Sequence, residues 1–294
     1  MHILKNYIDN QIKLNQGKNL FHERSNCKLS FSIATIDLIK QLDGITQKDE
    51  KILVNYTTQK VLQEFCRINQ YYSFRKKDKN SLNNIYSNLL HNIQENKTSI
   101  DSIFITHHNN LKNWLTKTNP FSEKIYRQEN EILKPVACAE YSATFQHDIL
   151  CLNPSQLLEP ILDIGCGKEG YLIKNLRKIG LEAYGIDRFT KKLPYTIEAN
   201  WLEFDYGIKK WGTIISHLGF SNHFAHNHLR KDGNFTEYAQ KYIDILNSLK
   251  TGGRFHYAPD LPFIEQYLGK DKFNIEKHKI ENLQLNASVI KRLK

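Results

Sequence analysis

The stretch Ile161-Leu162-Asp163-Ile164-Gly165-Cys166-Gly167 decides the fold of this chain. It joins a short β-rich run to two glycines, and a helical pattern follows to about Ile179. A strand that ends in glycines and opens a helix lets the backbone approach a ligand closely and presents the N–H groups of the helix start to it. The stretch therefore predicts a strand, a ligand-binding turn and a helix, with a tight turn that binds nothing as the alternative.

β-Rich runs and helical patterns alternate through the rest of this half. Further strands are expected at 183–186, 213–216 and 254–258, with a helix over about 235–249 and a turn at 251–253. Two final runs, near 273–280 and 288–293, predict an antiparallel hairpin. Strands that alternate with helices specify a parallel sheet with right-handed crossovers. The predicted fold class is therefore α/β.

The N-terminal half is mostly helical in its pattern. Apolar residues at helical spacing predict helices at about 47–75, 81–95 and 99–117. Asn119-Pro120 ends this run, because the residue before a proline avoids the helical region. We predict two domains: an all-helical N-terminal cap that shapes the substrate site, residues 1–134, and an α/β domain, residues 135–294.

The composition, 40% hydrophobic and 24% charged, is that of a globular protein and excludes a wholly disordered chain. The formal net charge of +10 is spread evenly, since residues 1–150 carry 20 basic and 15 acidic side chains. Nucleic-acid binders usually concentrate their charge in a patch, so a nucleic-acid partner is not expected. The densest cluster, Arg75 to Lys79 beside Tyr71, Tyr72 and Phe74, suits either stacked bases or a solvated helix end.

The cysteines and the hydropathy pattern bear on location. There are five cysteines, an odd number, without a Cys-x-x-Cys pair. They predict reduced thiols rather than a disulfide framework. No signal-peptide pattern and no membrane-spanning run is expected. A cytoplasmic protein without a membrane partner is the prediction.

Three ordered motifs resemble those of class I S-adenosylmethionine-dependent methyltransferases. They are Asp163-x-Gly165-Cys166-Gly167, then Tyr184-Gly185-Ile186-Asp187, then Leu249-Lys250-Thr251-Gly252-Gly253-Arg254-Phe255. The resemblance implies a Rossmann-like, seven-stranded, mostly parallel sheet whose last strand is antiparallel, with S-adenosyl-L-methionine as cofactor. The segments SNHFAHNHLRKDGNFTEYA and FHYAPDLPFIE are similar to an uncharacterised bacterial group of these enzymes.

The resemblance also implies cofactor-binding roles for single residues of the first two motifs. Gly165 and Gly167 would pass the methionine and ribose part of the cofactor, and Asp163 would contact its amino group. Asp187, 22 residues after Gly165, would bind the ribose diol. Arg188 would lie beside the adenine.

Four further residues complete the implied cofactor site. Asn200 and Trp201 would lie near the adenine, Tyr141 would close the pocket, and Ser216 ends the strand that follows. A core tyrosine in a connecting helix is the alternative for Tyr141. The third glycine of the usual Gly-x-Gly-x-Gly motif is replaced by Glu169, and Gly170 follows one place later.

A histidine-rich segment follows the strand that ends at Ser216. Residues 217–228 contain four histidines and are interpreted as a loop where the superfamily usually places substrate chemistry. A histidine can accept the proton of an attacking nucleophile. His223 is the leading candidate for this base, followed by His217 and His226. No metal site is predicted, although three histidines at 223, 226 and 228 leave a metal as an alternative.

These observations predict a transferase, an S-adenosylmethionine-dependent methyltransferase that acts on an O, N or S atom of a small-molecule acceptor. The large cap and the histidine-rich segment favour a small, enclosed acceptor over a flat macromolecular surface. An RNA or protein methyltransferase, and a non-catalytic cofactor-binding module, are the alternatives.

Overall fold

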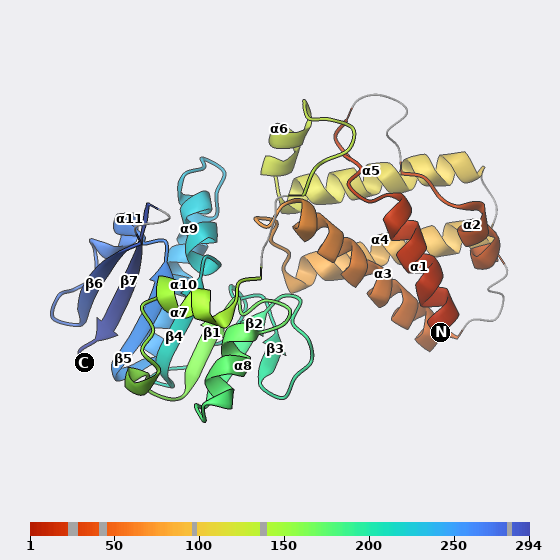
Figure 1. The fold of residues 1–294 in the computed structure, drawn as a ribbon. Helices are drawn as coiled ribbons and strands as arrows, with labels where there is room; N and C mark the ends of the chain where they lie inside the picture. The colour runs from red at the N-terminus through yellow and green to blue at the C-terminus, as the bar shows by residue number, and fades with distance from the viewer. Residues whose placement is uncertain (23–28, 41–45, 96–98, 136–139, 281–283) are drawn as a thin grey trace. The chain divides into compact units, whose positions relative to one another are not determined.

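The computed structural model describes residues 1–294 except 23–28, 41–45, 96–98, 136–139 and 281–283. The chain divides into two compact units, Met1–Cys138 and Ala139–Lys294 (Figure 1). The sequence places the boundary after Lys134, close to this division.

The first unit is helical. Its helices are α1 (His2–Leu14), α2 (Ile33–Lys40), α3 (Gln47–Ile68), α4 (Lys76–Glu95), α5 (Ile100–Thr118) and α6 (Phe121–Tyr126). Helix α4 packs against both α3 and α5, and α1 packs against α3. Thr46 and Ser99 accept backbone N–H groups at the starts of α3 and α5, where side-chain oxygens satisfy donors that lack a helical partner. The predicted helical character of this half is confirmed.

The aromatic residues beside the basic cluster belong to the core of this unit. Tyr72 and Phe74 are only 2% and 6% exposed. Phe74 stacks on Trp114 with ring centroids 5.0 Å apart, and Tyr72 stacks on Phe121 at 5.3 Å. These two rings are therefore not available to stack on nucleic-acid bases, and the basic residues at 76–79 lie in the first turn of α4.

The second unit contains a seven-stranded sheet. Its strands are β1 (Ile161–Ile164), β2 (Ala183–Asp187), β3 (Thr196–Glu198), β4 (Trp211–His217), β5 (Leu249–Ala258), β6 (Phe273–Ile280) and β7 (Leu285–Arg292). Their order is β3-β2-β1-β4-β5-β7-β6. Strands β1 to β5 pair in parallel, and β7 is antiparallel to both β5 and β6. The predicted α/β sheet and its C-terminal hairpin are confirmed.

Helices cover both faces of this sheet. Leu162, Ile164 and Ile214 pack with α9 (Phe220–His228) and α10 (Phe235–Ser248). Ile161, Ala183 and Ile215 belong to a second core cluster, with α7 (Ala143–Ile149) and α8 (Tyr171–Lys178). Side chains alternate between the faces along each strand. Asp163, Asp187 and His217 therefore share the face that α7 and α8 cover.

The structure differs from the sequence-based expectations in several segments. The helix expected at about 47–75 ends at Ile68 as α3, where the extended backbone of Asn69 ends the helix. Residues 220–228 form helix α9 instead of a loop, because Phe220 and Phe224, four residues apart, are both fully buried in the core. Residues 251–253 continue β5 instead of forming a separate turn, and the β4–β5 register shifts between Trp211 and Thr213. The short strand β3 is not in the prediction, and α11 (Pro262–Glu265) follows β5.

The state of the cysteines and the hydropathy of the helices can be compared with the predictions of reduced thiols and of no membrane-spanning segment. Cys66, Cys151 and Cys166 are reduced thiols, whereas Cys27 and Cys138 lie outside the described residues. None of the helices described here combines the length and the apolar character needed to cross a membrane.

We predict that Gly212→Ala destabilises the second unit. A Cβ at Gly212, in the buried strand β4, would overlap the carbonyls of Leu158 and Glu159, with the Glu159 oxygen at 2.7 Å. Backbone must shift to relieve this overlap, so the free energy of unfolding should fall by about 1–3 kcal/mol. Urea unfolding measures it. Gly269→Ala is the control, because its Cβ meets only the Asp271 carboxylate. Equal stability of the two variants would contradict the packing described.

Candidate functional site

The turn between β1 and α8 is built from glycines with left-handed backbone. Gly165 and Gly167 have φ of +82° and +75°, a region that side chains disfavour. The N–H groups of Gly165 and Cys166 both donate to the carbonyl of Ile186, at 2.8 and 3.1 Å. The turn is therefore fixed to the end of β2 by backbone hydrogen bonds, as the ligand-binding turn predicted from sequence requires.

The Asp187 carboxylate ends β2 directly beside this turn. Its Oδ2 accepts the N–H of Gly167 at 3.2 Å, and its Oδ1 accepts the N–H of Phe189 at 2.9 Å. The side chain is only partly buried. A carboxylate has about four acceptor positions, so Asp187 retains capacity for hydroxyl donors of a ligand.

The Asp163 carboxyl group lies on β1 and is 1% exposed. Neither oxygen has a hydrogen-bond partner among the described residues. Burial, and secondarily the Asp187 carboxylate, raise the pKa of Asp163 to about 8. Buried polar groups without partners are rare in proteins and often mark a functional site.

The Glu140 carboxylate is a site residue that is not among the cofactor-binding residues expected from the sequence. It accepts the N–H of Lys168 at 2.7 Å and that of Glu169 at 3.3 Å. A Cβ on Gly167 would lie 3.4 Å from the Glu140 carboxylate. Glu140 therefore holds the amides of the glycine turn from a position 28 residues earlier, and no local sequence signal predicts a contact at that separation.

Trp201 packs against the glycine turn from the side of α9. A Cβ on Gly165 would lie 3.2 Å from the Trp201 ring, and one on Gly219 would lie 3.6 Å from it. The neighbouring Asn200 turns its side-chain oxygen to the N–H of Leu202, at 3.0 Å. Trp201 thus lies at the predicted cofactor turn, while the Asn200 oxygen serves the local backbone.

Arg188 and Ser216 are two further residues that the motif resemblance places in the cofactor site. The Arg188 guanidinium lies 5.6 Å over the Phe189 ring, and its charge acts on buried His223. Ser216 is fully buried, and its hydroxyl donates to the carbonyl of Ile164 at 3.0 Å and accepts the N–H of Phe220 at 3.1 Å. The Ser216 hydroxyl therefore joins β1 to α9 through two hydrogen bonds to backbone.

His217 ends β4 in an aromatic setting. Its ring meets Tyr141 and Phe145 edge-on, with centroids 4.8 and 5.8 Å apart. Its Nε2 is buried without a hydrogen-bond partner in the part of the chain that the structure describes. Burial lowers the pKa of His217 to about 4, so the imidazole is neutral at pH 7. The next residue, Leu218, has a positive φ of 52°, and such backbone strain is common at functional sites.

The other two candidate bases have different environments. His223 is 3% exposed, and Trp201 meets its ring edge-on at 4.8 Å. Burial first, and then the charge of Arg188, hold the pKa of His223 well below its ordinary value. His226 is partly buried with its Nε2 3.1 Å from Arg230, and its pKa is lowered by burial and by that cation. His223 and His226 lie on α9, whereas His217 lies on β4. Among the three candidates, His217 is the one that shares a sheet face with Asp163 and Asp187.

The described residues contain no group of three or more His, Cys, Asp or Glu side chains placed to hold a metal ion. His228, from the histidine-rich segment, instead stacks on Phe263, with ring centroids 3.9 Å apart.

Comparison with known proteins gives matches of structure and none of sequence. No family model matches the chain, and no curated protein does. A TehB-like SAM-dependent methyltransferase from Corynebacterium glutamicum is 17% identical, with 45% of this chain and 79% of that chain covered and a TM-score of 0.34. An rRNA methylase from Streptococcus thermophilus is 13% identical (54% and 100% covered, TM-score 0.36). The N-methyltransferase NodS from Bradyrhizobium japonicum is 12% identical (51% and 96% covered, TM-score 0.34).

The fold itself is assigned from the sheet. Seven strands in the order β3-β2-β1-β4-β5-β7-β6, with β7 antiparallel, form the sheet that the motif resemblance implies. The second unit therefore has the Rossmann-like fold of class I S-adenosylmethionine-dependent methyltransferases, and S-adenosylmethionine is the cofactor that the motif resemblance implies.

Two observations show that the residues fit this cofactor. The turn at Gly165 and Gly167 carries no side chain that would fill the ligand space. It adjoins the Asp187 carboxylate, which can still accept hydrogen bonds. The orphaned Asp163 carboxyl lies on the same sheet face, where an ammonium group would supply the partner that it lacks.

We predict that Asp163→Asn stabilises the ligand-free chain in a pH-dependent way. The folded pKa of about 8 exceeds the ordinary value of 3.8. Between these values the unfolded chain releases this proton and the folded chain keeps it, so the natural chain loses stability as pH rises. The stability difference between the variant and the natural chain should grow by up to about 1.4 kcal/mol per pH unit in this window. It should be constant below about pH 4.

Urea unfolding from pH 3.5 to 8.5 measures this difference. Asp205→Asn is the control, since Asp205 is exposed. A difference for Asp163→Asn that does not change with pH would contradict the buried, protonated state of this carboxyl group.

Proposed function

We propose that this chain is an S-adenosylmethionine-dependent methyltransferase that modifies a small-molecule acceptor. One observation carries the proposal: the left-handed glycine turn after β1, the Asp187 carboxylate and the orphaned Asp163 carboxyl meet at the carboxyl edge of the sheet. Ligands of open α/β sheets bind at this edge.

Each proposed cofactor-binding residue contacts a different part of the cofactor. Gly165 and Gly167 leave room for the ligand beside the turn, and Asp187 accepts the ribose hydroxyls. Asp163 pairs with the ammonium group, and Trp201 and Tyr141 cover the site from two sides. When bound, S-adenosylmethionine supplies a methyl group on a positively charged sulfur. The enzyme's contribution is alignment of the acceptor for in-line displacement, which can lower the barrier by about 7–11 kcal/mol.

We assign the base, where the acceptor needs one, to His217. We rank His217 above His223 and His226, because His223 is buried behind Trp201 and His226 is paired with Arg230. His217 has a neutral imidazole and an unpartnered Nε2 at the carboxyl end of β4, within the described residues. The rings of Tyr141 and Phe145 around it suit a small, partly apolar acceptor better than a flat surface.

The proposed function is tested with purified chain and methyl-labelled S-adenosylmethionine. The label should enter the small-molecule fraction of a cell extract, and mass spectrometry then identifies the acceptor. Label recovered in the RNA or protein fraction would show that the chain is a methyltransferase but that its acceptor is a macromolecule instead of a small molecule. Tight cofactor binding without transfer to any fraction would support a non-catalytic binding module instead.

We predict that Asp187→Ala weakens the binding of S-adenosylhomocysteine by about 1.5–3 kcal/mol, the loss of hydrogen bonds to a charged group. Isothermal titration calorimetry measures it. Asp205→Ala is a matched control, because Asp205 also accepts the N–H two residues later, at 2.9 Å. If both variants bind with unchanged affinity, Asp187 does not contact the ribose.

We predict that His217→Ala lowers kcat by about 10²–10⁴-fold while cofactor affinity persists. Because the pKa of His217 is lowered to about 4, the natural enzyme should lose activity only as pH falls toward 4. An unshifted histidine would give this loss near 6.5. His228→Ala, a change at an exposed residue of α9, should leave the profile unchanged. A loss confined to KM would make His217 a positioning residue.

A further inference from the structure

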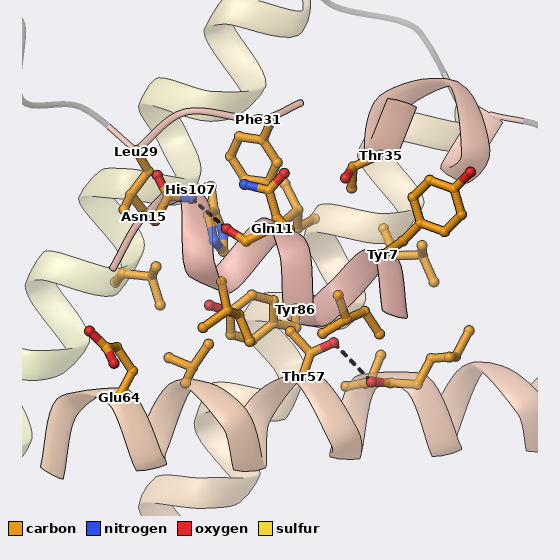
Figure 2. A pocket seen from close by; sticks show the side chains of 18 of the residues that line it. Tyr7, Gln11, Asn15, Leu29, Phe31, Thr35, Thr57, Glu64, Tyr86 and His107 are labelled. Carbon is orange, nitrogen blue, oxygen red and sulfur yellow. Dashed lines mark hydrogen bonds between the residues drawn. The ribbon is translucent and has the colours of Figure 1, made fainter. Parts of the chain in front are cut away.

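The helical unit contains a cavity of about 190 Å³ that the proposed methyltransferase site does not use. All of α1 to α5 contribute to its walls, and Figure 2 shows the side chains around it. Most of these are apolar, among them Leu53, Val54, Val61 and Leu111. In other proteins, apolar cavities of about 150 Å³ stay dry and bind benzene. The volume therefore fits a molecule built on one aromatic ring.

One buried polar group in the wall has no hydrogen-bond partner among the described residues. His107, on α5, is 4% exposed, and its Nδ1 makes no hydrogen bond within the described ranges. Its ring is met edge-on by Tyr86 and Phe31, with centroids 5.1 and 5.8 Å away. Because buried imidazole nitrogens are normally hydrogen-bonded, this atom marks the place where a ligand would supply the missing bond.

The other polar side chains labelled in Figure 2 are largely committed to the protein. Gln11 donates to the carbonyl of Ser30 at 2.6 Å. The Glu64 carboxylate is bound by Arg67 through two contacts of 2.7 Å and accepts a backbone N–H. Burial, and secondarily His108, lower the pKa of His107 to about 3, so it is neutral. The wall also contains Lys18, whose ammonium group donates to the Ser30 hydroxyl at 2.6 Å. Since the Glu64 charge is paired with Arg67 and the Lys18 ammonium is bound to this hydroxyl, we expect a neutral ligand.

We propose that this cavity binds a neutral phenol, with the ring among the apolar side chains and the hydroxyl on Nδ1 of His107. A hydroxyl group both donates and accepts, so it satisfies either tautomer of the imidazole. The rings of Phe31, Tyr86 and His107 favour an aromatic over an aliphatic body, because aromatic rings pack well edge-to-face. The binding site lies within the first unit and does not depend on methyl transfer.

The test compares p-cresol with p-xylene, which replaces the hydroxyl by a methyl group. Both are titrated into the full chain, without methyl donor, and ligand-observed NMR gives the two Kd values. The natural chain should bind p-cresol saturably. His107→Leu removes the partner of the hydroxyl, so the ratio of the two Kd values should shift about five- to tenfold in favour of p-xylene.

Two further variants make the result decisive. Val61→Phe fills the cavity and should weaken both ligands at least tenfold. His91→Leu, a change at a histidine whose side chain is 67% exposed on α4, should leave both affinities unchanged. Circular dichroism verifies that each variant is folded. The proposal is overturned if p-cresol does not saturate the natural chain, if Val61→Phe has no effect, or if His107→Leu leaves the ratio unchanged.

Discussion

The hydrogen bonds from Gly165 and Cys166 to the carbonyl of Ile186 are the constraint on which the second unit depends. They tie the turn after β1 to the end of β2, and they require a backbone conformation that glycine adopts without strain. With the turn fixed, the Asp187 carboxylate meets the N–H of Gly167, and Trp201 packs against Gly165. The positions of the site side chains therefore depend on the backbone conformation of this turn.

A common feature of the two units is the neutral ionisable group held in an apolar environment. Burial raises the pKa of Asp163 and lowers the pKa of both His217 and His107. In each case the charged form would lose hydration that the protein does not replace. Such groups reduce the stability of the folded chain, and they offer a hydrogen bond that is strong because water does not compete for it.

The sequence predicts the sheet well because the signals involved are local. The run from Ile161 to Gly167 determines a strand, a turn and a helix through neighbours in the chain, and Asp187 ends the next strand at a set distance. The histidine-rich segment is harder to predict. Phe220 and Phe224 lie one helical turn apart and favour a helix, but the histidines between and after them have no clear apolar periodicity.

Contacts between distant segments could not be predicted in this way. The hydrogen bonds from the amides of Lys168 and Glu169 to the Glu140 carboxylate span 28 and 29 residues. The cavity beside His107 arises where five helices pack together. The burial of His223 likewise depends on Trp201 and α10 rather than on its neighbours in sequence. Packing, rather than pattern, determines which of several similar side chains can reach a ligand.

Side chains of β4 point alternately to the two faces of the sheet, and this limits which changes in the length of β4 the site can tolerate. Ser216 and His217 are adjacent in sequence but point to opposite faces, one bonded to α9 and the other among Tyr141 and Phe145. Insertion or deletion of one residue in β4 would exchange their faces, whereas a change of two would preserve them. Related chains that keep this chemistry should therefore vary the length of β4 only in steps of two.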